Sequence, residues 1–166
     1  MLELNNTGPL CQTMVANKEP PLTEGMRFYR AEPVPSFWGN PAWPDSWDNG
    51  RWGPPYALLQ GSLALLPSST IMVPRAERHS ATHVQIKQGM VAWAGGAGGT
   101  EFFIALAAHP EWGTDHSVWG EVEPADMAVV SAIIDQPRRT ERWGSLNVSI
   151  LAISVPFCLV HTASTT

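Results

Sequence analysis

The stretch GGTEFFIALAAHPEWGTDHSVWGEV, Gly98–Val122, decides the fold of this chain. Its apolar run FFIAL begins after two glycines and a polar pair, and a second run, HSVWGEV, follows a loop that begins at His109. Short apolar runs bounded by turn residues are typical of strands, so we predict two strands that pair across this loop. The loop carries Trp112 and His116, and we expect these rings to face a binding site together with Phe103.

The composition fits one domain made of many short strands. The chain has 166 residues, of which 44% are hydrophobic and 15% charged, and its formal net charge is −5. This negative charge argues against nucleic acid or an anionic membrane as the main partner. The 15 prolines and 14 glycines favour a turn-rich β structure over a helical bundle.

Further strands are predicted on both sides of the opening stretch. They lie at residues 1–4, 26–33, 56–66, 86–96 and 148–157, each bounded by glycine, proline or polar residues. Many short strands of this kind indicate a small β-barrel or a β-sandwich.

Two helices are predicted beside the strands. Residues 8–20 are compatible with a short helix that has Pro9 in its first turn. Between Pro124 and Pro137, apolar residues recur at helical spacing over about three turns. The polar residues Arg138–Trp143 that follow are predicted to be a connection.

The composition changes over residues 36–55, where we predict a long loop rich in tryptophan and proline. This loop holds half of the eight tryptophans of the chain: Trp38, Trp43, Trp47 and Trp52. Clustered tryptophans often anchor partners, so the loop is a candidate protein-binding segment; the equal alternative is that it folds back onto its own barrel.

Other patterns that suggest a site have simpler explanations. His79 and His83 are spaced like a helical metal pair, but they lack its glutamate and its apolar face, so a solvated loop is predicted. The run AGGAGG lacks the lysine of a phosphate loop, and a tight turn explains it. Cys11 and Cys158 predict two buried thiols, with one disulfide between the two ends of the chain as the alternative.

The two ends of the sequence bear on location. No signal peptide is visible at the N-terminus, so we expect a cytoplasmic or organellar protein if Met1 is the true start. The apolar stretch LNVSILAISVPFCLV near the C-terminus is shorter than the roughly 20 residues of a spanning helix and contains polar side chains. A buried strand is therefore predicted there, and no membrane insertion.

Three blocks of sequence, taken together, point to a known family. They are FYRAEP (Phe28–Pro33), YALLQG (Tyr56–Gly61) and the opening stretch, in that order. They resemble the successive signatures of the cyclophilins, the peptidyl-prolyl cis-trans isomerases, and the likeness extends over most of the chain. The resemblance implies a single mainly β domain over residues 1–166. Its expected fold is a closed antiparallel β-barrel with two flanking helices, in which the family's first strand is missing upstream of residues 1–4.

The resemblance also implies a set of site residues, carried over by position. The implied catalytic residues are Arg30, Gln60, Phe103 and His116. The implied substrate-binding residues are Tyr56, Leu58, Ala94, Glu101 and Trp112. Neither a metal ion nor a cofactor is implied.

Some of these positions depart from the family pattern. Ala57 and Leu58 stand where the family has Phe-Met, so one aromatic side of the site is missing unless Tyr56 compensates. Glu101 replaces a glutamine and adds a negative charge, and Gly95 replaces an asparagine. We therefore expect reduced activity.

The implied activity is the isomerisation of Xaa–Pro bonds in proline-containing peptides or proteins. Rotation about this bond has a barrier of roughly 18–20 kcal/mol because the amide is conjugated. No covalent bond is broken, so catalysis requires only a surface that fits the twisted amide better than either planar isomer. In the family reading, Arg30 donates toward the prolyl nitrogen, Phe103 and Leu58 hold the proline ring, and Gln60 orients a peptide carbonyl.

Two other functions remain open from the sequence. The first is a catalytically weak or inactive cyclophilin-like module that binds a proline-containing peptide or serves as a structural subunit of a larger complex. The loop Trp38–Trp52 supports it, and so does the open N-terminal edge, because an unpaired edge invites another chain. The second is carbohydrate binding through the clustered tryptophans.

Overall fold

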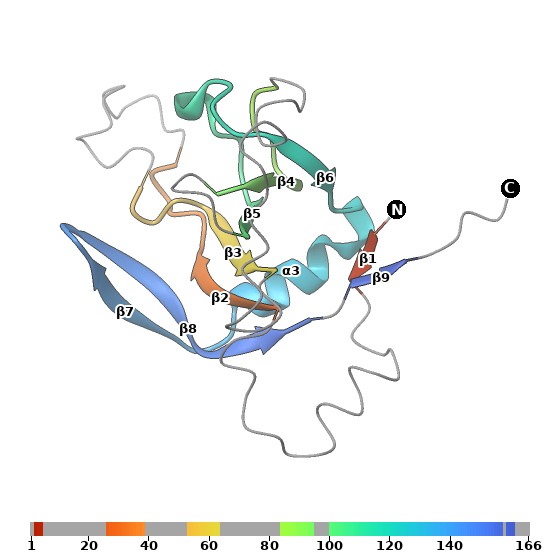
Figure 1. The fold of residues 1–166 in the computed structure, drawn as a ribbon. Helices are drawn as coiled ribbons and strands as arrows, with labels where there is room; N and C mark the ends of the chain where they lie inside the picture. Colours follow the sequence, from red (N-terminus) through yellow and green to blue (C-terminus); the bar gives the residue numbers. More distant parts are fainter. Residues whose placement is uncertain are drawn as a thin grey trace, which may run out of the picture.

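Strands make up most of the computed structural model, which describes residues 2–4, 26–38, 53–63, 84–94, 100–157 and 159–161. The strands are β1 (Leu2–Leu4), β2 (Arg27–Glu32), β3 (Leu58–Ser62), β4 (Met90–Trp93), β5 (Glu101–Ala105), β6 (Val118–Glu121), β7 (Arg138–Trp143), β8 (Leu146–Pro156) and β9 (Leu159–His161). Seven of them form one antiparallel sheet in the order β6-β4-β5-β3-β2-β8-β7, and β1 pairs with β9 (Figure 1). The predicted mainly β fold is confirmed.

The predicted pairing of FFIAL with HSVWGEV is wrong. Both runs contain strands, β5 and β6, but β4 lies between them and forms a ladder with each. The connection over residues 106–117 is longer than the roughly 2–5 residues of a hairpin loop, so the chain can cross β4 before it returns.

The segment Arg138–Trp143 is a strand, β7, and the prediction of a polar connection is wrong. It pairs with β8 along its whole length, and the two-residue turn between Trp143 and Leu146 contains Gly144 at φ 62°. Glycine adopts this left-handed conformation without steric cost. Every residue of β7 is exposed, so the strand lacks the apolar alternation by which strands are recognised.

The two faces of the sheet bury different side chains. On one face is the helix-side core, which consists of Phe28, Ala31, Leu59, Val91, Phe102, Ile104, Val130, Ile134, Leu151 and Phe157. On the other is the site-side cluster of Tyr56, Leu58, Ile86, Ala92, Phe103 and Ala105. Successive residues of a strand point to opposite faces, so Phe102 of β5 enters the first group and Phe103 the second.

The helix predicted between Pro124 and Pro137 is confirmed. It consists of the short 3₁₀ turn η3 (Pro124–Asp126), followed by α3 (Met127–Ile134). Val130 and Ile134 are buried in the helix-side core, and each fully buried apolar side chain contributes about 1.5–3 kcal/mol of stability. The helix therefore covers one face of the sheet and leaves the other for the site.

Several predictions fall outside the described residues: the helix at residues 8–20, most of the loop at residues 36–55, the pair His79 and His83, the glycine-rich run after Ala94, and both cysteines, Cys11 and Cys158. Within the described ranges, every helix is too short or too polar to cross a membrane.

Candidate functional site

One row of paired residues crosses the sheet and carries three of the four predicted catalytic residues. Arg30 on β2 pairs with Gln60 on β3, Gln60 pairs with Phe103 on β5, and Phe103 pairs with Ala92 on β4. Residues directly opposite each other in antiparallel strands lie on the same face of the sheet. The strand register alone thus brings Arg30, Gln60 and Phe103 together.

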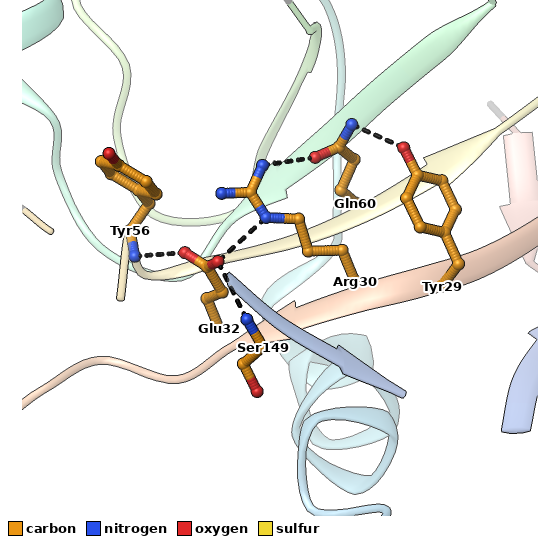
Figure 2. Close-up of polar contacts among 6 residues, drawn as sticks. All are labelled: Tyr29, Arg30, Glu32, Tyr56, Gln60 and Ser149. Carbon is orange, nitrogen blue, oxygen red and sulfur yellow. Dashed lines mark hydrogen bonds and ion pairs between the residues drawn. The ribbon is translucent and has the colours of Figure 1, made fainter. Parts of the chain in front are cut away.

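A chain of polar side chains begins at Arg30. Its Nη1 donates to Gln60 Oε1 at 2.9 Å, and Gln60 Nε2 donates to the Tyr29 hydroxyl at 2.7 Å (Figure 2). The Tyr29 hydroxyl in turn donates to Glu101 Oε2. We call Arg30–Gln60–Tyr29–Glu101 the polar chain; it includes two predicted catalytic residues and one predicted binding residue.

Tyr29 reaches this chain because β2 is bulged. The pairing with β3 passes from Phe28 opposite Gly61 to Arg30 opposite Gln60, which makes Tyr29 the extra residue of the bulge. Burial raises the pKa of the Tyr29 hydroxyl above its ordinary value, and the hydrogen bond to Glu101 raises it further. Tyr29 therefore stays protonated and remains a donor to the carboxylate.

A buried carboxylate lies on the other side of Arg30. Glu32 Oε1 accepts the Arg30 Nε–H at 3.0 Å, and the Glu32 side chain is 0% exposed, against 12% for Arg30. Backbone N–H groups of Tyr56 and Ser149 also donate to this carboxylate, at 2.6 Å and 3.3 Å (Figure 2). Glu32 thus joins β2, β8 and the segment that precedes β3.

Two aromatic rings flank the guanidinium. The Arg30 Cζ lies 5.4 Å from the centre of the Tyr56 ring and 5.2 Å from the centre of the Trp143 ring. Both distances are within the range of cation–π attraction. Tyr56 belongs to the site-side cluster, so an aromatic ring is present beside Ala57, where the family's phenylalanine is missing.

The aromatic part of the site is built on Phe103. The ring centre of Trp112 lies 5.3 Å and that of His116 5.1 Å from Phe103, both in edge-on geometry, and Trp112 and His116 are 4.9 Å apart. We call these three rings the aromatic triad. Trp112 ends the 3₁₀ turn η2 (Pro110–Trp112), and His116 Nδ1 donates to the carbonyl of Trp93 at 3.0 Å. The loop thus brings Trp112 and His116 together with Phe103, as predicted, and their role in a binding site stays a prediction.

A second histidine supports the triad from behind. The His109 ring stacks on Trp112 at 3.6 Å with an interplanar angle of 7°, and it is fully buried. Its Nδ1 lies 2.7 Å from Glu111 Oε1, and its Nε2 lies 3.4 Å from the Ala57 carbonyl. His109 thus holds Trp112 against Phe103.

The remaining predicted residues lie at the edges of this arrangement. Leu58 is buried in the site-side cluster, and Ala94 packs against that cluster. The Ala94 N–H donates to the Glu101 carbonyl at 3.0 Å. The Glu101 carboxylate is engaged by Tyr29, so it belongs to the polar chain rather than to the aromatic triad. The roles of these residues in binding stay predictions.

Sequence reasoning missed four residues that shape the site: Tyr29, Glu32, His109 and Trp143. A signal existed for Glu32, because residues two apart on a strand lie on the same side and Glu32 follows Arg30 at that spacing. A signal existed for Trp143 as well, since Gly-Ser between two runs is a two-residue hairpin turn. Nothing in the sequence marks the bulge that places Tyr29.

Comparison with known proteins adds an independent finding. The model of the family described as cyclophilin type peptidyl-prolyl cis-trans isomerase/CLD matches residues 60–155, more than half of the chain. The matched region begins at Gln60 and includes the aromatic triad, whereas Arg30 and Tyr56 lie before it. No curated protein matches the chain.

Proposed function

The chain belongs to the cyclophilin-type peptidyl-prolyl cis-trans isomerase family, and we propose that it catalyses cis–trans isomerisation of Xaa–Pro bonds in proteins. The observation that carries the proposal is the pairing of Arg30 with Gln60 on the same sheet face as the aromatic triad. A hydrogen-bond donor therefore lies beside a surface that can receive the proline ring.

In this mechanism Arg30 stabilises the twisted amide. Conjugation is lost as the Xaa–Pro bond rotates, and the lone pair of the prolyl nitrogen becomes available as an acceptor. Arg30 Nε and Nη1 are already engaged, whereas Nη2 makes no hydrogen bond to the described residues (Figure 2). Nη2 is thus the donor that we assign to the prolyl nitrogen. A donor held in place before the reaction costs no reorganisation during it.

The proline ring binds at the aromatic triad in this proposal. Phe103 is only 2% exposed, so its role is to support the rings of Trp112 and His116, which are partly exposed. The proline ring of the substrate packs against these two rings. Gln60 orients a peptide carbonyl through its amide, and Leu58 and Ala94 line the same face. The whole chain, residues 1–166, acts as one domain in this reading.

A second candidate function rests on the burial around the site. Arg30 is held by two hydrogen bonds and two rings, and Phe103 is almost completely covered. These features suit a weakly active or inactive module that binds a proline-containing segment. The loop Trp38–Trp52 and the N-terminal edge are then the proposed contacts with a larger complex.

Magnetisation-exchange NMR on a short Xaa–Pro peptide tests the proposal. Wild type is expected to accelerate cis–trans exchange, and Arg30→Ala is expected to reduce the acceleration strongly, to a residual rate that is still measurable, while the protein stays folded. Arg139→Ala is the matched control, because Arg139 is an exposed arginine on β7, and it should behave as wild type. If folded wild type fails to accelerate exchange but shifts its Trp112 and His116 signals on peptide addition, the binding module replaces the enzyme.

A further inference from the structure

Glu32 is the most completely buried carboxylate of the site, and each of its oxygens is engaged. Oε1 accepts from Arg30 Nε at 3.0 Å and from the Ser149 N–H at 3.3 Å, and Oε2 accepts from the Tyr56 N–H at 2.6 Å. Removing a carboxylate from water costs several kcal/mol unless hydrogen bonds and an opposite charge compensate. Here both are present, so Glu32 is a fixed negative charge beside Arg30.

The contact made by Glu32 determines how the guanidinium is oriented. A single contact at the end of a long arginine side chain leaves the planar group free to turn. In this site Glu32 fixes Nε, and Gln60 fixes Nη1 at 2.9 Å. Two contacts to different nitrogens of one rigid plane define the direction of the third nitrogen, Nη2. Figure 2 shows Nη2 as the guanidinium nitrogen that carries no dashed line.

We propose that Glu32 is a positioning residue for the isomerase reaction, which fixes the plane of the Arg30 guanidinium so that Nη2 is held toward the bound prolyl nitrogen. The inference rests on the proposed function. Glu32 itself does not contact the substrate and acts through Arg30. The neighbouring rings of Tyr56 and Trp143 limit motion out of that plane, at 5.4 Å and 5.2 Å from Cζ.

The contrasting explanation is a purely structural one. Glu32 also joins the backbone of Tyr56 to that of Ser149, and this connection alone could account for a buried glutamate. The two explanations differ in how Glu32 and Arg30 depend on each other. A positioning residue loses its influence on catalysis once Arg30 is absent, whereas a purely structural residue keeps it.

A kinetic double-mutant cycle separates the two. The variants are Glu32→Gln, Arg30→Ala and the double variant, with turnover and peptide affinity measured by NMR line shapes. Glu32→Gln is expected to lower kcat about 10- to 100-fold with little change in KM, because a misplaced catalytic group loses rate rather than binding. In the Arg30→Ala background, Glu32→Gln should have no further effect. A wild-type kcat in Glu32→Gln, or an equal loss in both backgrounds, would overturn the proposal.

A spectroscopic measurement tests the positioning without any activity. The Nε–Hε signal of Arg30 should be visible and slow to exchange with water in wild type, and it should weaken or vanish in Glu32→Gln. Persistence of this signal in Glu32→Gln overturns the positioning role, even if the enzyme is active. If instead wild type shows the protected signal but no isomerase activity, the proposed function fails and the anchoring of Arg30 by Glu32 stands.

Arg30→Lys keeps the test decisive if Glu32→Gln does not fold. Lysine retains the positive charge but lacks the planar group that contacts Glu32 and Gln60 at the same time. The proposal predicts that Arg30→Lys loses as much activity as Arg30→Ala. If Arg30→Lys keeps more than about a tenth of the wild-type rate, a point charge is sufficient and orientation by Glu32 is not required.

Discussion

Arg30 and Gln60 lie directly opposite each other on β2 and β3, and a 2.9 Å hydrogen bond joins Arg30 Nη1 to Gln60 Oε1. Both residues were carried over from family motifs that are well separated in the sequence. Their contact follows from strand register, because opposed residues of an antiparallel pair have neighbouring side chains. A one-residue slip of β3 would place Gln60 on the opposite face and break the site.

Gln60→Ala should reduce catalysis without unfolding the protein. The change removes the acceptor of Arg30 Nη1 and the donor to Tyr29, and a hydrogen bond to a charged group contributes about 1.5–3 kcal/mol. The expected loss in kcat/KM is therefore about 10- to 100-fold, measured by NMR exchange on a Xaa–Pro peptide. Gln136→Ala, which removes an exposed glutamine after α3, should leave the rate unchanged. Equal rates for the two variants would refute a role for Gln60.

Trp143→Ala should lower kcat/KM for the peptide less than Gln60→Ala does. The ring lies beside the Arg30 guanidinium and is 39% exposed, and an exposed cation–π contact contributes about 0.5–1 kcal/mol. We expect kcat/KM to fall about two- to fivefold. Ile153→Ala is a suitable control, because Ile153 is an exposed apolar residue of β8 in the same hairpin. An equally large loss in Ile153→Ala would show that the effect comes from disturbing the β7–β8 hairpin and not from the contact between Trp143 and Arg30.

Gly61→Ala should destabilise the fold, whereas Gly120→Ala should not. A Cβ at Gly61 would lie 2.8 Å from the Arg27 carbonyl oxygen and 2.9 Å from the Phe102 ring, so the strands must shift. Overpacking of this kind costs about 1–3 kcal/mol. At Gly120 the nearest atom is Val91 Cβ at 3.6 Å, an ordinary contact. The free energies of unfolding in urea check this, and similar values for both variants would contradict the close packing at Gly61.

The raised pKa of Tyr29 predicts a specific decline of stability in alkali. An unfolded tyrosine ionises near pH 10, whereas burial and Glu101 keep the folded hydroxyl protonated to higher pH. The folded state then binds the Tyr29 proton more tightly than the unfolded state does. The stability that this difference contributes is fully present below about pH 10 and is lost as the pH rises further. The unfolding free energy of Tyr29→Phe should fall less steeply above pH 10 than that of wild type. Parallel curves would show that Tyr29 is not the responsible group.

The elements that the sequence predicts well are those with an apolar pattern. β2, β3 and β5 carry short apolar runs bounded by turn residues, α3 carries apolar residues at helical spacing, and the structure contains each of these elements. β7 shows no pattern because no side chain of it is buried, and its stability comes from backbone pairing with β8. The apolar pattern of a strand also does not show which strands are its neighbours, so the position of β4 between β5 and β6 could not be predicted.

The residues of the site likewise fall into those that the sequence predicts and those that it does not. Arg30, Gln60 and Phe103 came from motifs, and register explains why they meet. The spacing of two between Arg30 and Glu32 is visible in the sequence, but the contacts of Glu32 with Tyr56 and Ser149 join distant segments. Trp143 likewise reaches Arg30 from a distant segment, and spacing within one segment carries no information about such contacts. The sequence places His109 only at the start of a loop, whereas its ring is the packing partner of Trp112.

The hydrogen bond from the Ser149 N–H to Glu32 joins residues that are 117 positions apart. While the chain is being synthesised, Glu32 therefore lacks this donor until β8 has left the ribosome. Contacts of such large sequence separation also slow folding, because the entropy of loop closure is lost before the contact forms. The Arg30 site is thus expected to assemble late, after the strands β3, β4 and β5 have found one another.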